Sequence, residues 1–303
     1  MARQRYADRL FRVWRPSHQQ EDQSGRSITA QLPDYLSAKL YAEASIIFIG
    51  TDPEIGCVYK RSGEWRSIVH IFHDEDKRHA IGLDGQRTTA SLELRPGIHE
   101  SAESVVHRLA TLVNLMREYY HPPVVAYRCG AWVDPEPLGG HIHLSWDNEV
   151  APTEQTIRRL LSGLNVIQHR LVMEMFDTGQ LAIRRNHAAR NGRDYGKLGV
   201  FRAVPHAQGT FAHVVRQRHI EYRYPPSWML TPEMAYTFLA SAEIVAKLVL
   251  VEGYTGPWRA VARDIFDEGT RLPEPGAPSV KQAYLLAKRH LRWTDDLTDH
   301  WLP

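Results

Sequence analysis

The pattern of hydrophobic and polar residues predicts short strands that alternate with long helices. Residues 45–50 form an apolar run typical of a buried strand, and residues 91–95 alternate polar and apolar side chains as a half-buried strand does. Apolar residues recur at helical spacing over 101–120. Further strands are expected at 65–72, 124–129, 140–145 and 219–224, and further helices at 153–176, 231–252 and 280–292. This mixture indicates an α+β fold with a mainly antiparallel sheet.

The ends of the chain differ in character from its middle. Residues 1–44 are polar and turn-rich, and we interpret them as an N-terminal arm or peripheral element. Nothing in residues 45–303 indicates a second domain, so one domain is expected there. Within it, residues 184–218 are basic and rich in Gly, His and Asn, which predicts a long functional loop region.

Composition excludes few classes of protein but indicates the cellular setting. The 303 residues are 43% hydrophobic and 24% charged, as in a soluble globular protein. A formal charge of +2 does not demand nucleic acid as a partner. No apolar run reaches the roughly 18 residues that would suggest a membrane span. Two cysteines, Cys57 and Cys129, are too few for a disulfide framework, so a reducing, cytoplasmic setting is expected.

Two histidines lie two residues apart in a short predicted strand. They belong to the segment Gly139-Gly140-His141-Ile142-His143-Leu144-Ser145. Because residues i and i+2 of a strand point to the same face, His141 and His143 should project together. The glycine pair before them would let backbone or ligand approach closely. The arrangement could hold a metal ion or a polyphosphate.

Four carboxylates accompany the predicted strands. Asp52 and Glu54 end the first strand two residues apart, while Glu93 and Glu221 each lie between apolar neighbours. Any one of them could simply occupy the solvated side of its strand. Gathered on one face with the histidines, they would repel one another unless cations neutralised them. Oxygen ligands in that number suit Mg²⁺ or Mn²⁺, which commonly bind together with nucleotide phosphates.

Basic residues supply the second half of the pattern. Arg95 follows Glu93 by two residues and Arg223 follows Glu221 by two, so each Arg could pair with its Glu or bind a phosphate. Several more cations crowd the predicted loop region, namely Arg184, Arg185, Arg190, Arg193, Lys197 and Arg202. They indicate either a solvated basic loop or a phosphate-binding lid. Neither a Walker-type nor a G-x-G-x-x-G nucleotide motif is present.

These motifs, in this order, resemble the glutamine synthetase-like superfamily. The G-x-H-x-H-x-S run from Gly139, the E-x-R strand from Glu221 and the D-x-E pair from Asp52 are similar to glutamine synthetase motifs, with Asp in place of the first Glu. Smaller details resemble the phage-encoded carboxylate–amine ligases, or amidoligases, of that superfamily: Gly82-Leu83-Asp84-Gly85, Glu93-Leu94-Arg95-Pro96-Gly97 and Tyr195-Gly196-Lys197. The likeness covers patches of residues 46–232.

The resemblance implies a curved, mainly antiparallel sheet with helices packed on its convex side, and it implies specific roles. Metal ligands for Mg²⁺ or Mn²⁺ would be Asp52, Glu54, Glu93, His141 and Glu221. ATP contacts would be His143, Ser145, Lys197 and Arg202, and the catalytic arginines would be Arg223, Arg95 and Arg185.

The reaction implied is an ATP- and magnesium-dependent joining of a carboxylate to an amine through an acyl phosphate, in the cytoplasm of a bacterial or phage-infected cell. The substrates would be small molecules or peptides, and no nucleic acid or membrane would be required. A homo-oligomer is compatible with such sites. Two alternatives remain open from the sequence: a metal-dependent phosphotransferase, and a structural or virion-associated interaction protein on the same fold.

Overall fold

The computed structural model describes most of the chain. Its described residues are 47–59, 62, 81–83, 91–120, 125–147, 150–204, 207–208, 210–268, 280–289, 291–293 and 295–301. The expected N-terminal arm at 1–44 and the expected strand at 65–72 lie outside them, as do two residues of the Gly82–Gly85 motif. The assignment of 45–303 to one catalytic domain stays a prediction.

Two open sheets form the framework, and every strand pairing among the described residues is antiparallel. The larger sheet has the order β11(Ala207–Gln208), β10(Phe201–Val204), β12(His219–Tyr222), β9(Ile142–Trp146), β1(Ile47–Thr51) and β5(Ile98–His99). The smaller has the order β3(Ile81–Leu83), β4(Ser91–Leu94), β2(Glu54–Tyr59) and β6(Val125–Arg128), and a separate hairpin pairs β7(Trp132–Val133) with β8(Glu136–Pro137).

The chain passes from the larger sheet to the smaller one through two residues. β1 ends at Thr51 and β2 begins at Glu54, so Asp52 and Pro53 form the link. The carbonyl of Pro53 accepts a hydrogen bond from the Leu94 amide at 3.1 Å, which joins the link to β4. This connection places the ends of both sheets side by side, and Asp52 and Glu54 lie where they meet.

The predicted helices are confirmed, with small shifts at their ends. They are α3(Ala102–Tyr120), α4(Glu154–Met175), α7(Pro232–Leu250) and α9(Val280–Arg289). Thr153 and Thr231 cap α4 and α7, each accepting a hydrogen bond from the backbone amide three residues ahead. Shorter helices follow at α8(Trp258–Arg263), the π-helical turn at 264–268 and α10(Thr298–Trp301). None of the helices described is long and apolar enough to cross a membrane.

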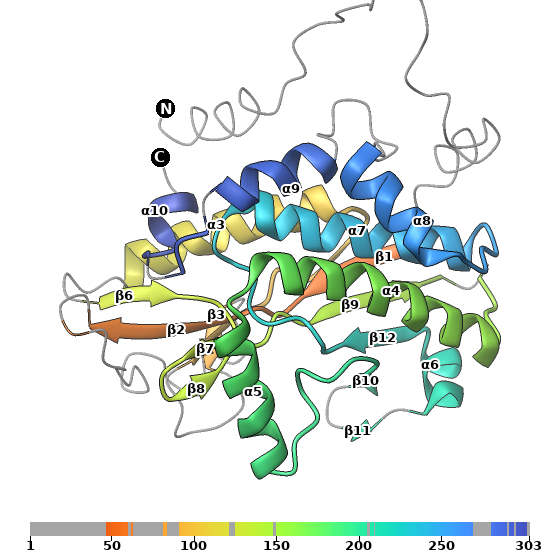
Figure 1. The fold of residues 1–303 in the computed structure, drawn as a ribbon, viewed down its shortest axis with the longest axis horizontal. Coiled ribbons are helices and arrows are strands. Elements are labelled where there is room, and N and C mark those ends of the chain that lie inside the picture. Colours follow the sequence, from red (N-terminus) through yellow and green to blue (C-terminus); the bar gives the residue numbers. More distant parts are fainter. Residues whose placement is uncertain are drawn as a thin grey trace, which may run out of the picture.

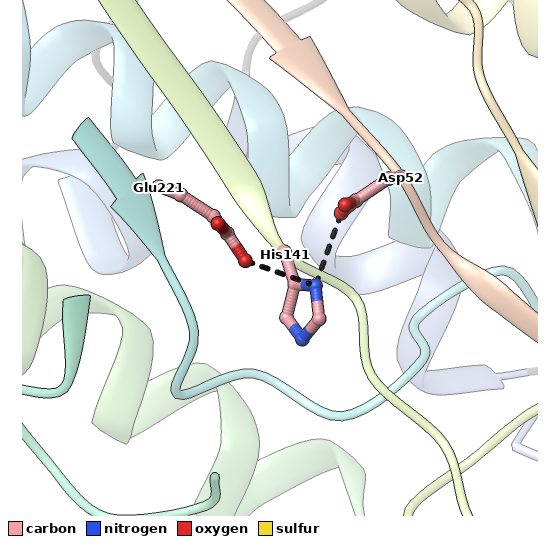
Figure 2. Close-up of side chains that lie close together, drawn as sticks. All are labelled: Asp52, His141 and Glu221. Atoms are coloured by element: carbon pink, nitrogen blue, oxygen red, sulfur yellow. Dashed lines mark ion pairs between the residues drawn. The ribbon is translucent and has the colours of Figure 1, made fainter. Parts of the chain in front are cut away.

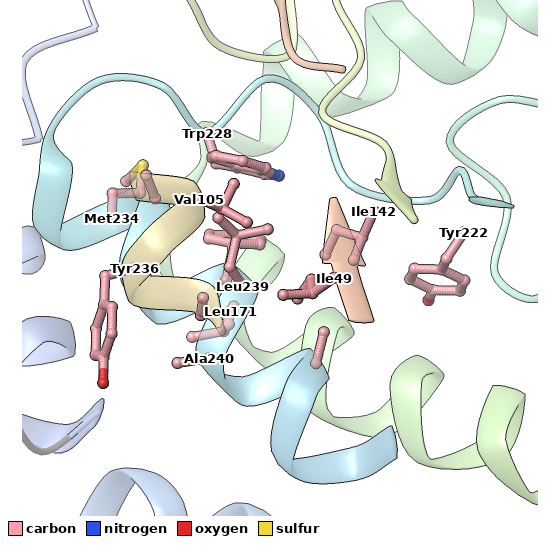
Figure 3. Close-up of a cluster of buried hydrophobic side chains, with 14 of the residues drawn as sticks. Ile49, Val105, Ile142, Leu171, Tyr222, Trp228, Met234, Tyr236, Leu239 and Ala240 are labelled. Atoms are coloured by element: carbon pink, nitrogen blue, oxygen red, sulfur yellow. The ribbon is translucent and has the colours of Figure 1, made fainter. Parts of the chain in front are cut away.

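The hydrophobic core lies between the sheets and the helix layer. Almost every residue of α7 is buried, because this helix is apolar on all sides and packs against α3, α4, α9 and the strands β1 and β9. Figure 3 shows Ile49 and Ile142 from the strands facing Leu171 of α4 and Leu239 of α7. In Figure 1, α3, α7 and α9 lie along one side of the sheets, while α5(Thr178–Arg190), β7 and β8 lie along the other.

The expectation that 184–218 is an irregular loop region was wrong for much of its length. Residues 178–190 form α5, 201–204 form β10 and 211–217 form α6(Phe211–Gln217). Helix α5 has only three buried residues, so its sequence lacks the apolar stripe by which helices are recognised. Its clearest sequence signal is the N-cap Asp177, whose side chain accepts from the Gln180 amide.

Candidate active site

The candidate residues lie on the sheet face that is opposite the hydrophobic core. In β9 the apolar residues Ile142 and Leu144 are fully buried, which turns His141 and His143 to the other face. In β12 Ile220 and Tyr222 point to the core in the same way. Period-two alternation therefore collects the polar side chains of several strands on one surface, as the sequence predicted.

Three of the predicted metal ligands meet at one point. Nδ1 of His141 lies 3.2 Å from Oδ1 of Asp52 and 3.5 Å from Oε1 of Glu221. Figure 2 shows the two carboxylates on either side of the imidazole, with Asp52 from the end of β1 and Glu221 from β12. All three ligand atoms lie within 4.8 Å of one another. Thr51 fixes the backbone here by donating its hydroxyl to the His141 carbonyl at 2.5 Å.

Strand register extends this cluster across the larger sheet. Glu221 pairs with His143 on one side and with Arg202 on the other. Nε2 of His143 lies 3.3 Å from Oδ2 of Asp52. Arg223, two residues after Glu221, places its Nε 2.9 Å from Oε1 of that carboxylate. Cations thus flank the carboxylates on the side of the site that leads to β10.

The smaller sheet contributes the remaining carboxylates. Glu54 and Glu93 lie directly opposite each other in β2 and β4. Like charges in that position destabilise a sheet unless cations balance them. Arg95 forms an ion pair with Glu93, as the two-residue spacing predicted. Glu54 also accepts a hydrogen bond from the Gly139 amide at 2.7 Å, which ties it to the segment that precedes His141.

Burial and neighbouring charges shift the pKa values of several side chains in the site. Burial acts against ionisation of Asp52, but the neighbouring His141 and His143 outweigh it and hold the pKa of this carboxyl well below its usual value. Burial acts against a charged His143 as well, yet Asp52, with smaller contributions from Glu221 and Glu93, raises the pKa of His143. The pKa of Arg202 is lowered by burial and by the nearby Arg223.

The two glycines before His141 are required by close packing. A Cβ atom on Gly139 would lie 2.6 Å from Nε2 of His141 and 3.2 Å from Oε1 of Glu54. On Gly140 it would lie 2.5 Å from the Pro226 carbonyl and 2.6 Å from Nε1 of Trp228. The glycines therefore let protein groups, including two candidate ligands, come close to the backbone.

The donor set fits a divalent cation. Oδ1 of Asp52 is buried and, among the described residues, has no hydrogen-bond partner, although it lies beside Nδ1 of His141. Buried carboxylate oxygens of this kind require a partner. Carboxylates combined with one or two imidazoles are ligands that Mg²⁺ or Mn²⁺ accepts. Asp52, His141 and Glu221 could hold one ion, and Glu54 and Glu93 lie where the second sheet adjoins them.

Some sequence-predicted residues lie apart from this centre. Ser145 is on the same face of β9, but its strand partners are Phe48 and His219 rather than a carboxylate. Arg185 is exposed on α5, and Lys197 is exposed and paired with Asp194 at 2.8 Å. The structure does not bring Arg185 or Lys197 into contact with the carboxylates.

Two further residues support the site without having been assigned to it. Arg184 of α5 is buried and donates to the carbonyls of Tyr224 and Pro225, which fixes the chain just beyond Arg223. Its burial lowers the pKa of Arg184 to about 10. His219 lies beside His143, and its spacing of two from Glu221 is a signal from which the alternation rule could have placed it.

Comparison with known families assigns the chain to one of them. The family model of the phage phiEco32-like COOH.NH2 ligase-type 2 matches residues 49–252, which is more than half of the chain and includes every carboxylate of the site. The chain belongs to this family.

Other comparisons are more distant. A bifunctional glutathione synthetase from Pasteurella multocida aligns with a TM-score of 0.45 at 10% identity, over 88% of this chain and 49% of that one. The chain thus spans about half the length of that protein. A novel glutamine synthase homolog aligns with a TM-score of 0.43 at 15% identity, over 88% of this chain and 73% of the other. No curated protein matches the chain.

Proposed function

We propose that this protein is a carboxylate–amine ligase, which uses ATP and Mg²⁺ or Mn²⁺ to activate a carboxylate as an acyl phosphate that an amine then attacks to form an amide or isopeptide bond. The observation that carries the proposal is the convergence of Asp52, His141 and Glu221 within 4.8 Å. Two more carboxylates, Glu54 and Glu93, face each other where the second sheet adjoins this cluster. A fold gains no stability from gathering like charges, whereas a site for metal-bound polyphosphate requires them.

In this proposal Asp52, His141 and Glu221 hold one ion, and Glu54 and Glu93 complete the ligand set for another. The ions would spread the negative charge of the phosphates during transfer. His143 would contact the phosphates beside Asp52.

The arginines are placed to bind the group that is transferred. Arg223 pairs with Glu221 at 2.9 Å, and Arg202 lies across the strand pair from that same carboxylate. They would hold the γ-phosphoryl group in line while a carboxylate oxygen of the substrate attacks phosphorus and the bond to ADP breaks. Arg95, beside Glu93, is placed to bind the substrate carboxylate from the other sheet. The amine then displaces phosphate, which leaves as the amide forms.

Three of the residues predicted from the sequence have less structural support for a role in this reaction: Arg185, Lys197 and Ser145. The exposed Arg185 and Lys197 would need to approach a bound nucleotide to contribute, and Ser145 lies two residues beyond His143 on β9. We retain them as peripheral ATP contacts only. The substrates we propose are small molecules or peptides, and the setting is the cytoplasm, where ATP is available and Cys57 and Cys129 stay free. A homo-oligomer is compatible with this scheme.

Trapping the activated acid tests the proposal before the amine substrate is identified. The purified enzyme is incubated with ATP, Mg²⁺, pools of carboxylic acids and hydroxylamine, which converts an acyl phosphate to a hydroxamate. The proposal predicts ADP release that depends on a particular acid, together with the matching hydroxamate. ADP release with a phosphorylated product and no hydroxamate would instead identify a phosphotransferase.

A pair of matched variants distinguishes loss of the carboxylate cluster from the effect of removing any carboxylate. Glu221→Gln should reduce ADP release about 100-fold, since loss of one ligand and its hydrogen bonds weakens metal binding strongly. Glu154→Gln, which changes an exposed carboxylate on α4 that pairs with Arg158 at 3.9 Å, should leave ADP release unchanged. Equal activity in both variants would exclude the carboxylate cluster as the site of the reaction.

A further inference from the structure

His219 lies on the same sheet face as the candidate ligands but has no role in the scheme above. It begins β12, two residues before Glu221, and pairs with Ser145 of β9. Its ring is half-buried and lies 5.3 Å, centroid to centroid, from the ring of His143, with 24° between their planes. The two imidazoles are therefore nearly parallel neighbours on adjacent strands.

The hydrogen bonds of His219 have a defined direction. Nδ1 of His219 lies 3.0 Å from the Ala203 carbonyl, and a carbonyl oxygen can only accept. Nδ1 must therefore carry the hydrogen, and in the neutral ring Nε2 is left as an acceptor. Nε2 lies 3.0 Å from Nδ1 of His143, so that nitrogen of His143 is the donor.

This direction fixes which nitrogen of His143 faces the carboxylates. With Nδ1 engaged by His219, Nε2 of His143 is the atom that points to Asp52, 3.3 Å from its Oδ2. The chain of contacts runs from the Ala203 carbonyl through His219 and His143 to Asp52. Partners of this type fix the ring orientation of a histidine at a metal site.

We propose that His219 is a positioning residue, which holds His143 with Nδ1 as donor and presents Nε2 to the metal–nucleotide complex beside Asp52. The role of His143 at a metal–nucleotide complex rests on the proposed function, whereas the hydrogen bond between His219 and His143 does not depend on it. The role requires a side chain at position 219 that accepts a hydrogen bond from Nδ1 of His143. A ring of similar shape without an acceptor would leave the donor of His143 unsatisfied and free to turn away.

Nuclear magnetic resonance of the metal-free protein tests the geometry directly. With ¹⁵N-labelled histidine, the expected result is a hydrogen on Nδ1 of His143 and a scalar coupling across the hydrogen bond to Nε2 of His219. Spectra of His143→Gln and His219→Gln assign the two rings. A His143 ring that lacks a hydrogen on Nδ1 would overturn the proposal, whatever the protein binds.

Two substitutions at position 219 then separate the acceptor from the packing of the ring. His219→Phe keeps a ring but removes the acceptor, and His219→Gln keeps an acceptor near the position of Nε2. Binding of Mn²⁺ together with a non-hydrolysable ATP analogue, followed by electron paramagnetic resonance, should weaken about 10- to 100-fold in the Phe variant and stay close to wild type in the Gln variant. His107→Phe on α3, far along the chain and paired with Glu103, is the control.

The outcomes distinguish this inference from the proposed function. Unchanged binding of the Mn²⁺–nucleotide complex in His219→Phe, or equal losses in the Phe and Gln variants, would overturn the positioning role. A wild-type protein that binds no Mn²⁺–nucleotide complex would overturn the proposed function instead, and the coupling between the two rings would then decide the geometry alone.

Discussion

Gly139→Ala gives the sharpest structural prediction for the metal centre. The new Cβ would lie 2.6 Å from Nε2 of His141, whereas ordinary contacts begin at 3.4 Å, so the ring must move by about 0.8 Å. The ring cannot do so and keep Nδ1 between Asp52 and Glu221, at 3.2 and 3.5 Å. Misplacement of a reacting group by about 1 Å can reduce activity roughly 100-fold, which corresponds to about 2.7 kcal/mol.

The assay is Mn²⁺ binding to purified Gly139→Ala, with the thermal midpoint of the metal-free protein measured beside it. Gly140→Ala is the matched comparison, because its Cβ would meet the Pro226 carbonyl and Trp228 but no candidate ligand. We expect Gly139→Ala to lose metal affinity about 100-fold, and Gly140→Ala to lose mainly stability. Wild-type metal affinity in Gly139→Ala would refute the reasoning that His141 is held in place by the cluster.

Three other perturbations follow from the structure. Addition of Mn²⁺ should raise the thermal midpoint of the wild type, by the equivalent of about 2.7 kcal/mol at 100 times the dissociation constant, and a scanning fluorimetry trace that does not shift would count against a metal site. Lys247→Met should cost about 3–5 kcal/mol of unfolding free energy, because Glu243 of the buried pair, 2.6 Å away, would keep an uncompensated charge; a loss below about 1 kcal/mol in urea titration would contradict this. Leu171→Ala, fully buried between α4 and α7, should cost about 2–5 kcal/mol in the same titration while leaving the dissociation constant for Mn²⁺ unchanged, and altered binding would contradict the separation of core and site.

Local patterns in the sequence predicted much of the fold. Helices α4 and α7 were recognised because each combines an N-cap threonine with a long apolar pattern. Alternation in β9 and β12 correctly predicted that His141, His143, Glu221 and Arg223 share a face. These features depend on neighbours within a few residues, and such neighbours can be read from one sequence.

Features that depend on distant neighbours could not be predicted. Because α5 is mostly polar, its sequence did not predict a helix, nor did it predict the buried Arg184 that donates to the carbonyls of Tyr224 and Pro225. The pairing of β10 with β12, which brings Arg202 to Glu221, depends on a strand register that no local pattern encodes. Likewise, nothing near Gly139 reveals that its amide donates a hydrogen bond to Glu54, which is 85 residues away.

The most direct measurement for the central claim is a calorimetric titration of the purified protein with a non-hydrolysable ATP analogue, with and without Mg²⁺. The account predicts binding that requires the metal and is lost in Glu221→Gln but retained in Glu154→Gln. Binding that is equally strong without Mg²⁺, or that survives in Glu221→Gln, would contradict it.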